Sequence, residues 1–565
     1  MPVSLRSHAV ATALVLAASA SALPAQVPTV QDGRLPRQGA FWFELTPSFF
    51  SWSDQFALDS DLVADGSREP LAADFGGPIT DRLYPGSAPF LLDINSDADA
   101  LGYDPLAPND LSFGDLDYKE ISKQQRRFPF GLQIGILDRI SLEMTVPLVQ
   151  TTSTSFFRYD TTAASVTAGM NIVPDPMTFF GEFDDAQNQL TDLITSGTLT
   201  PEELAQATTL LANSSAFSSA LQRRVMENLF TPVGSSTAGL QMAATYDAFM
   251  AGYVDFGLAL PQLSIPGNAV PSDLDALFGS AELAADPPGD VTRGLDVGEL
   301  ELGLRIGILN TFTSITRFNE LASGEPGAPA DAEAAEGGER PVELGETARQ
   351  LARRPASVQF RTTVGVKLRI PLKDANGPPY LDPSNFLDVP IGNGQKDVEL
   401  SFFQDVRVSN VFLLLASAYY GMQLSDAVDL RVSPPDQPFA LASTLSTVER
   451  DLGNYFAARF APQVLINDVM ALGAEYNFWN KGSDRYTLLV GGVPTADPLD
   501  VETSQTRHML GVGAYYRTQD LWEDGRTSLP IEVAIIYQTA IAGSGGQTPA
   551  YQRFTVYLRL PAKIF

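Results

Sequence analysis

The residues best suited to chemistry are charged side chains that recur at alternate positions of the segments 296–309, 357–373 and 397–408. Apolar residues occupy the other alternate positions. Because successive side chains of a strand point to opposite faces, each charged set shares one face. Such residues either line a hydrated, weakly selective pore or pair across strands and close the interior, and pairing is favoured because buried charges are normally paired. The predicted lining residues are Glu299, Glu301, Arg305, Arg361, Lys367, Arg369, Glu399, Asp405 and Arg407.

A second candidate is the acidic stretch DINSDADALGYD at 93–104. Its oxygen-bearing side chains have the spacing of a calcium-binding loop, in which several carboxylates converge on a hard cation. Ala98 stands where such loops carry glycine, so a solvated acidic loop is the favoured interpretation and Ca²⁺ the alternative. The candidate ligands are Asp93, Asn95, Asp97, Asp99 and Asp104.

Composition excludes several other chemistries. The chain has no cysteine and a formal net charge of -30, which argues against a disulfide framework and against nucleic acid as a partner. His508 is the single histidine beyond the N-terminal region, and no G-x-S-x-G motif occurs. Serine hydrolase and multi-histidine metal chemistry are therefore disfavoured, and we expect neither an enzyme nor a cofactor other than the possible Ca²⁺.

Alternating segments long enough to cross a bilayer recur along the chain, since about 9 to 11 tilted residues suffice. They predict an all-β fold: a closed antiparallel transmembrane β-barrel of about 12 strands with long, partly helical extracellular loops. His508 is predicted to face lipid. The expected strands are 40–52, 127–137, 140–150, 296–309, 357–373, 397–408, 411–424, 454–466, 471–480, 505–517, 529–541 and 552–560.

The N-terminus and the gaps between strands suggest a location in the cell envelope. Residues 1–25 read as a secretory signal peptide, with Arg6 before an apolar run and small residues at the end. The rest, 26–565, is expected to form the barrel in the bacterial outer membrane, in contact with lipid. Long gaps alternate with short ones, as in outer-membrane barrels. The predicted inserts are an acidic extracellular loop at 53–125, a helical extracellular insert at 151–295 and a low-complexity periplasmic insert at 311–356.

The helical insert has its own signals. Thr200, Pro201 and Glu203 form an N-cap, a first-turn proline and a capping-box glutamate. Met and aromatic residues then recur at helical spacing, at Met242, Tyr246, Phe249, Met250 and Tyr253. We favour helices that pack on each other or cover the barrel mouth over an apolar vestibule for hydrophobic solutes, because such stripes are usually core.

Some segments resemble known families. FPFGLQIGILDRISLEMTVPLV, GELELGLRIGIL and VGVKLRIPL are similar to the strand pairs of the phenol-degradation (MetA-pathway) group of outer-membrane transporters and, more distantly, to the long-chain fatty-acid transporters. The alternating end with terminal Phe565 resembles the signal read by the barrel assembly machinery. These resemblances imply a passive channel for small molecules, hydrophobic ones included. The alternative is a closed barrel that serves as a surface scaffold, whose acidic and helical loops bind a partner or divalent cations.

Overall fold

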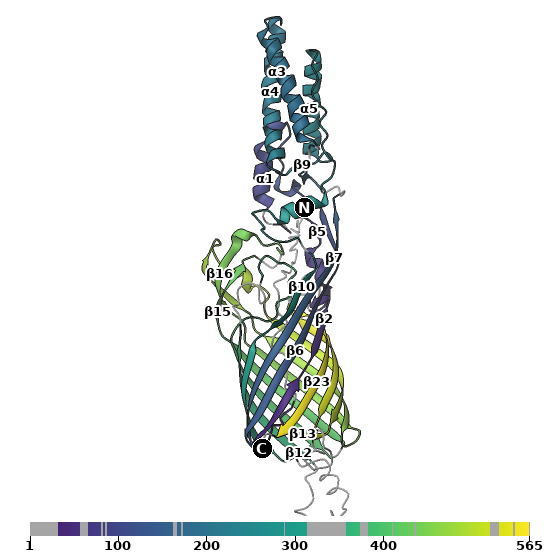
Figure 1. Ribbon diagram of the computed structural model, residues 1–565, viewed down its shortest axis with the longest axis vertical. Coiled ribbons are helices and arrows are strands. Elements are labelled where there is room, and N and C mark those ends of the chain that lie inside the picture. Colours follow the sequence, from purple (N-terminus) through teal and green to yellow (C-terminus); the bar gives the residue numbers. More distant parts are fainter. Residues whose placement is uncertain are drawn as a thin grey trace, which may run out of the picture.

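The computed structural model describes residues 32–56, 66–80, 83–84, 87–161, 166–170, 173, 175–287, 289–312, 358–372, 382–409, 411–433, 437–519, 530–545 and 548–563. It shows a tilted-strand barrel with helices projecting from one end (Figure 1). The predicted signal peptide, most of the 311–356 insert and Phe565 lie outside the described residues. None of the helices in the described ranges combines the length and apolarity needed to cross a membrane.

Twelve strands of the described chain form the wall as one closed antiparallel sheet. The first is divided into β1 and β2, and the fourth is preceded by the short β10 (Val291–Val297). The strands are β1 (Ala40–Leu45), β2 (Ser48–Trp52), β6 (Asp115–Leu137), β7 (Ile140–Asp160), β11 (Leu300–Asn310), β12 (Val358–Ile370), β13 (Asp397–Val408), β14 (Phe412–Gln423), β17 (Tyr455–Leu465), β18 (Met470–Lys481), β20 (Gln505–Arg517), β21 (Glu532–Ser544) and β23 (Gln552–Lys563).

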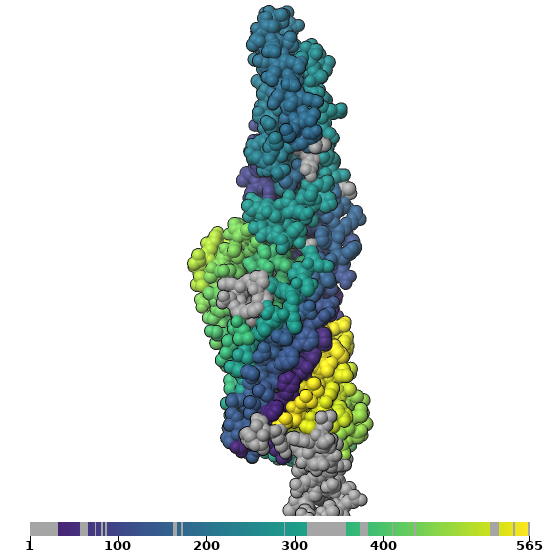
Figure 2. Space-filling model, viewed as in Figure 1, coloured from purple at the N-terminus to yellow at the C-terminus, as the bar shows by residue number. Residues whose placement is uncertain are grey.

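The barrel closes where its first strand meets its last. Phe43 of β1 is in register with Leu560 of β23 on one side and with Leu132 of β6 on the other. Figure 2 shows this seam, where the purple and yellow ends of the chain lie side by side. Closure leaves no edge strand with unsatisfied backbone groups, which a bilayer would not tolerate. The predicted twelve-stranded closed barrel is confirmed.

The outer face of the wall is apolar, as the alternation predicts. Val366 and Leu368 are exposed, whereas Lys367 between them is buried in the interior. His508 faces outward with Tyr476, whose hydroxyl lies 2.7 Å from the Nδ1 atom of His508. Exposed large apolar residues recur on the wall strands, including Phe43, Phe130, Leu142, Leu302, Phe360, Phe402, Tyr420, Phe460, Leu472, Val512, Ile535 and Phe554. This is the fold and surface of an outer-membrane β-barrel.

The two ends of the barrel differ. At one end, which we call the turn end, β1 begins, β23 ends and β6 meets β7 across Asp138 and Arg139. At the other, the loop end, the long connections emerge. β7 continues to Asp160 and β6 begins at Asp115, so both strands reach further into the predicted inserts than the alternation suggested. They form a ribbon that rises above the wall (Figure 1).

Six helices lie at the loop end within the described residues, and α3, α4 and α5 form a tower beyond the barrel (Figure 1). The predicted N-cap of α4 is confirmed, since the Thr200 side chain accepts the Glu203 N–H group, and the side chains of Asp175 and Ser236 cap α3 and α5 in the same way. The helices are α1 (Ser87–Ser96), α2 (Ala98–Leu101), α3 (Pro176–Thr195), α4 (Pro201–Met226), α5 (Thr237–Asp255) and α6 (Pro271–Phe278).

The remaining elements are short and belong to the loop end. β15, β16 and β19 form a small sheet beside the mouth (Figure 1). The bounds are β3 (Asp54–Phe56), β4 (Arg68–Pro70), β5 (Gly77–Pro78), β8 (Ala168–Gly169), β9 (Thr231–Pro232), β15 (Asp426–Arg431), β16 (Leu445–Asp451), β19 (Arg485–Gly491) and β22 (Thr548–Pro549). The 3₁₀ helices are η1 (Leu71–Phe75), η2 (Pro108–Asp110), η3 (Ala442–Thr444) and η4 (Asp497–Asp500).

One apolar core joins the tower to the mouth of the barrel. Trp52 and Met509 of the wall belong to the same buried cluster as Phe439 of a loop and Tyr246 of α5. Met242, Tyr246 and Tyr253 are buried, and Phe249 and Met250 pack against the core. The Met and aromatic stripe is therefore core between the tower helices, where the Tyr246 ring lies against Phe183 of α3 and Phe217 of α4.

Candidate functional site

The nine predicted lining residues all point into the barrel. All are buried except Arg361, which is partly exposed. The strand register divides them into two groups along the barrel axis. Glu299, Glu301, Lys367, Arg369 and Glu399 lie toward the loop end, whereas the others lie toward the turn end.

The loop-end group is a paired network. Lys367 Nζ donates to Glu301 at 2.9 Å, and Arg369 Nη1 donates to Asp397 at 2.8 Å. The register explains these pairs, since Asp397 lies directly opposite Arg369, and Glu301, which is also opposite Arg369, is the diagonal neighbour of Lys367. The Tyr455 hydroxyl also donates to Glu399 at 2.5 Å. Pairing rather than an open charged pore therefore describes this part of the interior.

The turn-end group holds a segment that sequence reasoning missed. Residues Asp32–Arg34, which we call the strap, precede β1 and lie inside the barrel rather than in its wall. The Gly33 amide donates to Asp405 at 3.1 and 3.3 Å, and Thr363 Oγ1 donates to the Gly33 carbonyl at 2.6 Å. Arg305 Nη2 donates to the Asp32 carbonyl at 2.5 Å. The strap thus contacts three neighbouring strands through its backbone.

Its side chains bind the opposite side of the barrel. Arg34 donates to Asp32 and, at 2.6 Å, to Glu532 of β21. Arg559 of β23 donates to Glu532 at 3.1 Å and to Glu44 of β1 at 2.7 Å. Each of these charges has an opposite charge within hydrogen-bond distance, which offsets the desolvation cost of burial. The strap therefore crosses the lumen and ties the β11–β13 side to the β21–β23 side.

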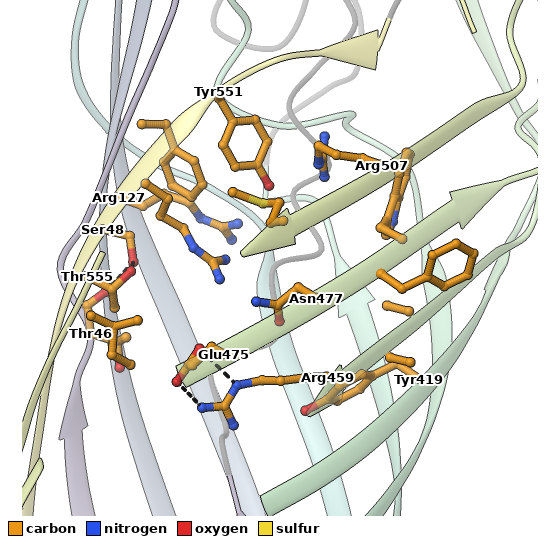
Figure 3. Close-up of a pocket in the computed structure, with 18 of the residues that line it drawn as sticks. Thr46, Ser48, Arg127, Tyr419, Arg459, Glu475, Asn477, Arg507, Tyr551 and Thr555 are labelled. Carbon is orange, nitrogen blue, oxygen red and sulfur yellow. Dashed lines mark hydrogen bonds and ion pairs between the residues drawn. The ribbon is translucent and has the colours of Figure 1, made fainter. Parts of the chain in front are cut away.

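Between the strap and the apolar mouth lies a cavity of about 70 Å³, which we call the central cavity. Figure 3 shows Arg459 and Glu475 joined at one side of it, with Arg127, Asn477 and Arg507 around the space. The lining residues are Thr46, Ser48, Phe50, Arg127, Pro129, Tyr419, Ala457, Ala458, Arg459, Glu475, Asn477, Phe478, Trp479, Arg507, Met509, Ile536, Tyr551, Arg553 and Thr555.

Sequence reasoning also missed the arginines of this cavity. Arg459, Arg507 and Arg553 occupy inward positions of β17, β20 and β23, the same alternation that identified the charged residues of β11–β13. Extending that reading to the later strands would have found them. What the alternation could not show is their convergence, because it depends on register across strands far apart in sequence.

The structure gives the calcium candidates a different setting. Asp93 and Asn95 lie in α1 and Asp99 in α2, so most of the stretch is helical rather than an open loop. Arg224 of α4, fully buried, donates to Asp93 at 2.6 Å and to Asp97 at 2.7 Å. Asn95 bonds the backbone of Leu106, and Asp104 bonds Gln241. Among the residues with described positions, no three acidic or histidine side chains converge as a metal site. The geometry therefore does not support the calcium prediction.

Comparisons with known proteins find structural likeness only. No family model matches the chain, and no curated protein matches it. Among solved structures, the COG4313 outer membrane channel from Pseudomonas putida F1 matches with a TM-score of 0.39 at 8% identity, over 95% of this chain and 99% of that one. A FadL homologue from Pseudomonas aeruginosa gives 0.26 at 8% identity, covering 93% and 91%. The toluene transporter TodX of Pseudomonas putida gives 0.24 at 6% identity, covering 93% and 90%.

Proposed function

We propose that this protein is a gated outer-membrane channel for small molecules, closed in this state by the strap. The observation that carries the proposal is a polar and aromatic cavity in the lumen whose turn-end side is occupied by a segment that is not part of the wall. That segment is the strap, which is held by hydrogen bonds to Asp405 and Thr363. A barrel that served only as a wall would need no such cavity, since small barrels fill their interior with side chains.

Orientation follows from the connections. In bacterial outer-membrane barrels, short turns and both termini face the periplasm, while long loops face outside. The turn end is then periplasmic, and the tower is extracellular. The strap lies on the periplasmic side of the cavity and is continuous with β1 through residues 35–39, where the Gly39 amide donates to the Gly135 carbonyl. It can therefore leave the lumen without disturbing the wall.

The ion pairs favour a strap that can be released. When Arg34 leaves, Glu532 keeps its bond to Arg559, so no buried carboxylate loses its only partner there. Asp405 likewise retains Arg361, whose Nη1 is 3.4 Å away. Release costs the strap's own hydrogen bonds and those that Arg305 donates to the Asp32 and Arg34 carbonyls, while the wall carboxylates Glu532 and Asp405 each keep an arginine.

A disulfide lock tests the proposal, because the chain has no native cysteine. A Cβ placed on Gly33 would lie 3.4 Å from Cβ of Phe403, close to the roughly 3.5 to 4.5 Å that disulfides span. We expect Gly33→Cys/Phe403→Cys protein to be silent in planar bilayers when oxidised and to conduct when reduced, because reduction frees a strap whose packing on Phe403 is already lost.

Single variants supply the controls. Phe403→Cys alone removes the aromatic ring whose centroid lies 4.2 Å from the Arg305 guanidinium, but it cannot form the disulfide. It therefore reports the effect of losing the ring without the effect of the cross-link. It should conduct in either redox state. If the reduced double variant stays silent while it keeps the heat-modifiable mobility of a folded barrel, the channel proposal fails.

The alternative function is a closed scaffold that binds a partner through the tower. It is favoured by large apolar side chains exposed on the tower, namely Met177, Leu240 and Val254 with 82%, 60% and 65% of their surface exposed. Persistent silence of the reduced channel would leave this function as the better account.

A further inference from the structure

The central cavity carries an excess of positive charge. Among the described residues that line it, Glu475 is the only carboxylate, against Arg127, Arg459, Arg507 and Arg553. Glu475 is already saturated: Arg459 Nε donates to it at 3.2 Å, Tyr515 at 2.5 Å and Gln538 at 2.7 Å. It has no capacity left to neutralise Arg507 or Arg553.

Donors without acceptors surround the same space. Arg507 is 3% exposed, and its Nε and Nη1 atoms have no hydrogen-bond partner in the described structure. The indole nitrogen of Trp479, which is 7% exposed, and the amide nitrogen of Asn477 also have no hydrogen-bond partner in the described structure. Buried donors of this kind normally have acceptors, and a buried cation normally has an anion. The missing complement is therefore an acceptor-rich anion.

The surroundings of Arg507 also specify an apolar portion. The guanidinium lies 4.3 Å from the ring centroid of Tyr551 and 5.0 Å from that of Trp479, so its faces are covered and its edge is left for an anion. Arg553 Nε donates to the neutral Gln538 Oε1 at 2.7 Å. Met509 and Ile536 complete an apolar side of the cavity. A fully hydrated inorganic anion would leave this side unused.

We propose that the central cavity binds a small carboxylate with an apolar body, with its carboxylate on Arg507 and Arg553 and its body against Met509, Ile536 and Trp479. This inference rests on the proposed function, because the solute must enter the lumen. The planar guanidinium matches a carboxylate with two parallel hydrogen bonds. The cavity is smaller than the roughly 150 Å³ cavity that holds benzene in an engineered protein, so a chain of a few carbons fits better than a ring.

Titration calorimetry on the reduced Gly33→Cys/Phe403→Cys channel tests the proposal without requiring conductance. The probes are butyrate and its neutral isostere butyramide. We expect butyrate to bind about tenfold or more tightly than butyramide, because only butyrate supplies charge-assisted acceptors. Inorganic phosphate should bind more weakly than butyrate, because it cannot use the apolar side.

Variants connect the binding to the named residues. Arg507→Gln/Arg553→Gln should lower butyrate affinity about tenfold or more, and Arg507→Lys/Arg553→Lys should retain part of it. Arg126→Gln/Lys119→Gln removes two positive charges from exposed positions of β6 and should leave binding unchanged. Equal binding of butyrate and butyramide, or equal loss in the control pair, would overturn the proposal.

Conductance separates the two proposals. Under a salt gradient the reduced channel should show a reversal potential whose sign indicates anion selectivity. Arg507→Gln/Arg553→Gln should shift this reversal potential toward zero. A channel that conducts with cation selectivity contradicts the carboxylate site and leaves the channel function intact. A channel that never conducts, yet binds butyrate through Arg507 and Arg553, contradicts the channel function and leaves the site intact.

Discussion

Replacing Arg224 by methionine tests whether the acidic stretch serves the helical tower rather than a cation. The Arg224 side chain is fully buried and joins α4 to α1 through Asp93 and Asp97, and it also donates to the Phe230 carbonyl at 2.9 Å. Breaking a buried pair by removing one partner costs about 3 to 5 kcal/mol. Asp93 is 35% exposed, and Asp97 keeps Arg223, so we expect about 3 kcal/mol, near the lower end of that range.

The assay is urea unfolding followed by circular dichroism of the helices, with gel mobility reporting whether the barrel stays folded. Arg158→Met is the matched control, since its ion pair with Asp160 is exposed and worth less than about 1 kcal/mol. Calcium or a chelator should not move the midpoint of the wild-type protein. The reasoning is refuted if Arg224→Met behaves like the control, or if Ca²⁺ stabilises the tower as an oxygen-lined site would.

Three further predictions concern the wall and the tower. Val364→Arg should destabilise the barrel by about 2 to 4 kcal/mol in vesicles, measured by urea unfolding, because Val364 alternates with the inward residues at the centre of β12 and is expected to meet mid-bilayer lipid. Val364→Leu should be close to neutral. Gly421→Ala should lower the unfolding midpoint, because a Cβ there would lie 1.8 Å from the Tyr455 ring and displace the Tyr455 hydroxyl from Glu399. The effect should vanish in Tyr455→Ala protein, which has no ring to displace. Hydrogen bonds from the Thr200 backbone and side chain lower the pKa of Glu203 below its ordinary 4.5. The capping box therefore stabilises α4 fully above pH 4.5, and this stabilisation is lost as the pH falls through the lowered pKa of Glu203. Helicity should therefore decrease on acidification in the wild type and less so in Glu203→Gln, as measured by circular dichroism.

The wall could be predicted because its signal is local. In β12, Val366 and Leu368 alternate with Lys367 and Arg369, and one face must meet lipid while the other meets the interior. The cross-strand ion pairs followed from the same alternation, since neighbouring strands place Lys367 opposite Glu399. Strand ends were less predictable, and β7 reaches Asp160 because polar Thr and Ser residues continue the ribbon above the membrane, where apolar alternation is no longer required.

The strap and the acidic stretch could not be predicted because their partners are distant in sequence. Gly33 binds Asp405, and Asp97 binds Arg224, and neither pair is marked by any local pattern. The spacing of acidic residues at 93–104 fits a cation loop and a helix equally, since a helix also gathers residues three and four apart on one face. Only the buried guanidinium of Arg224 decides between them.

The net charge of the chain does not indicate the charge of the lumen, because it sums the charges of the surface and of the interior. A chain with a net charge of -30 suggests an affinity for cations, yet the described lining of the central cavity holds four arginines and one saturated carboxylate. Charges on exposed loops are screened over about 8 Å at physiological ionic strength, whereas charges inside the barrel are screened much less. The acidic exterior therefore reduces the local concentration of anions near the mouth without determining which ion the lumen holds. In the proposed channel, selectivity depends on the few donors around Arg507, where water is scarce, and these donors come from inward positions of β17, β20 and β23.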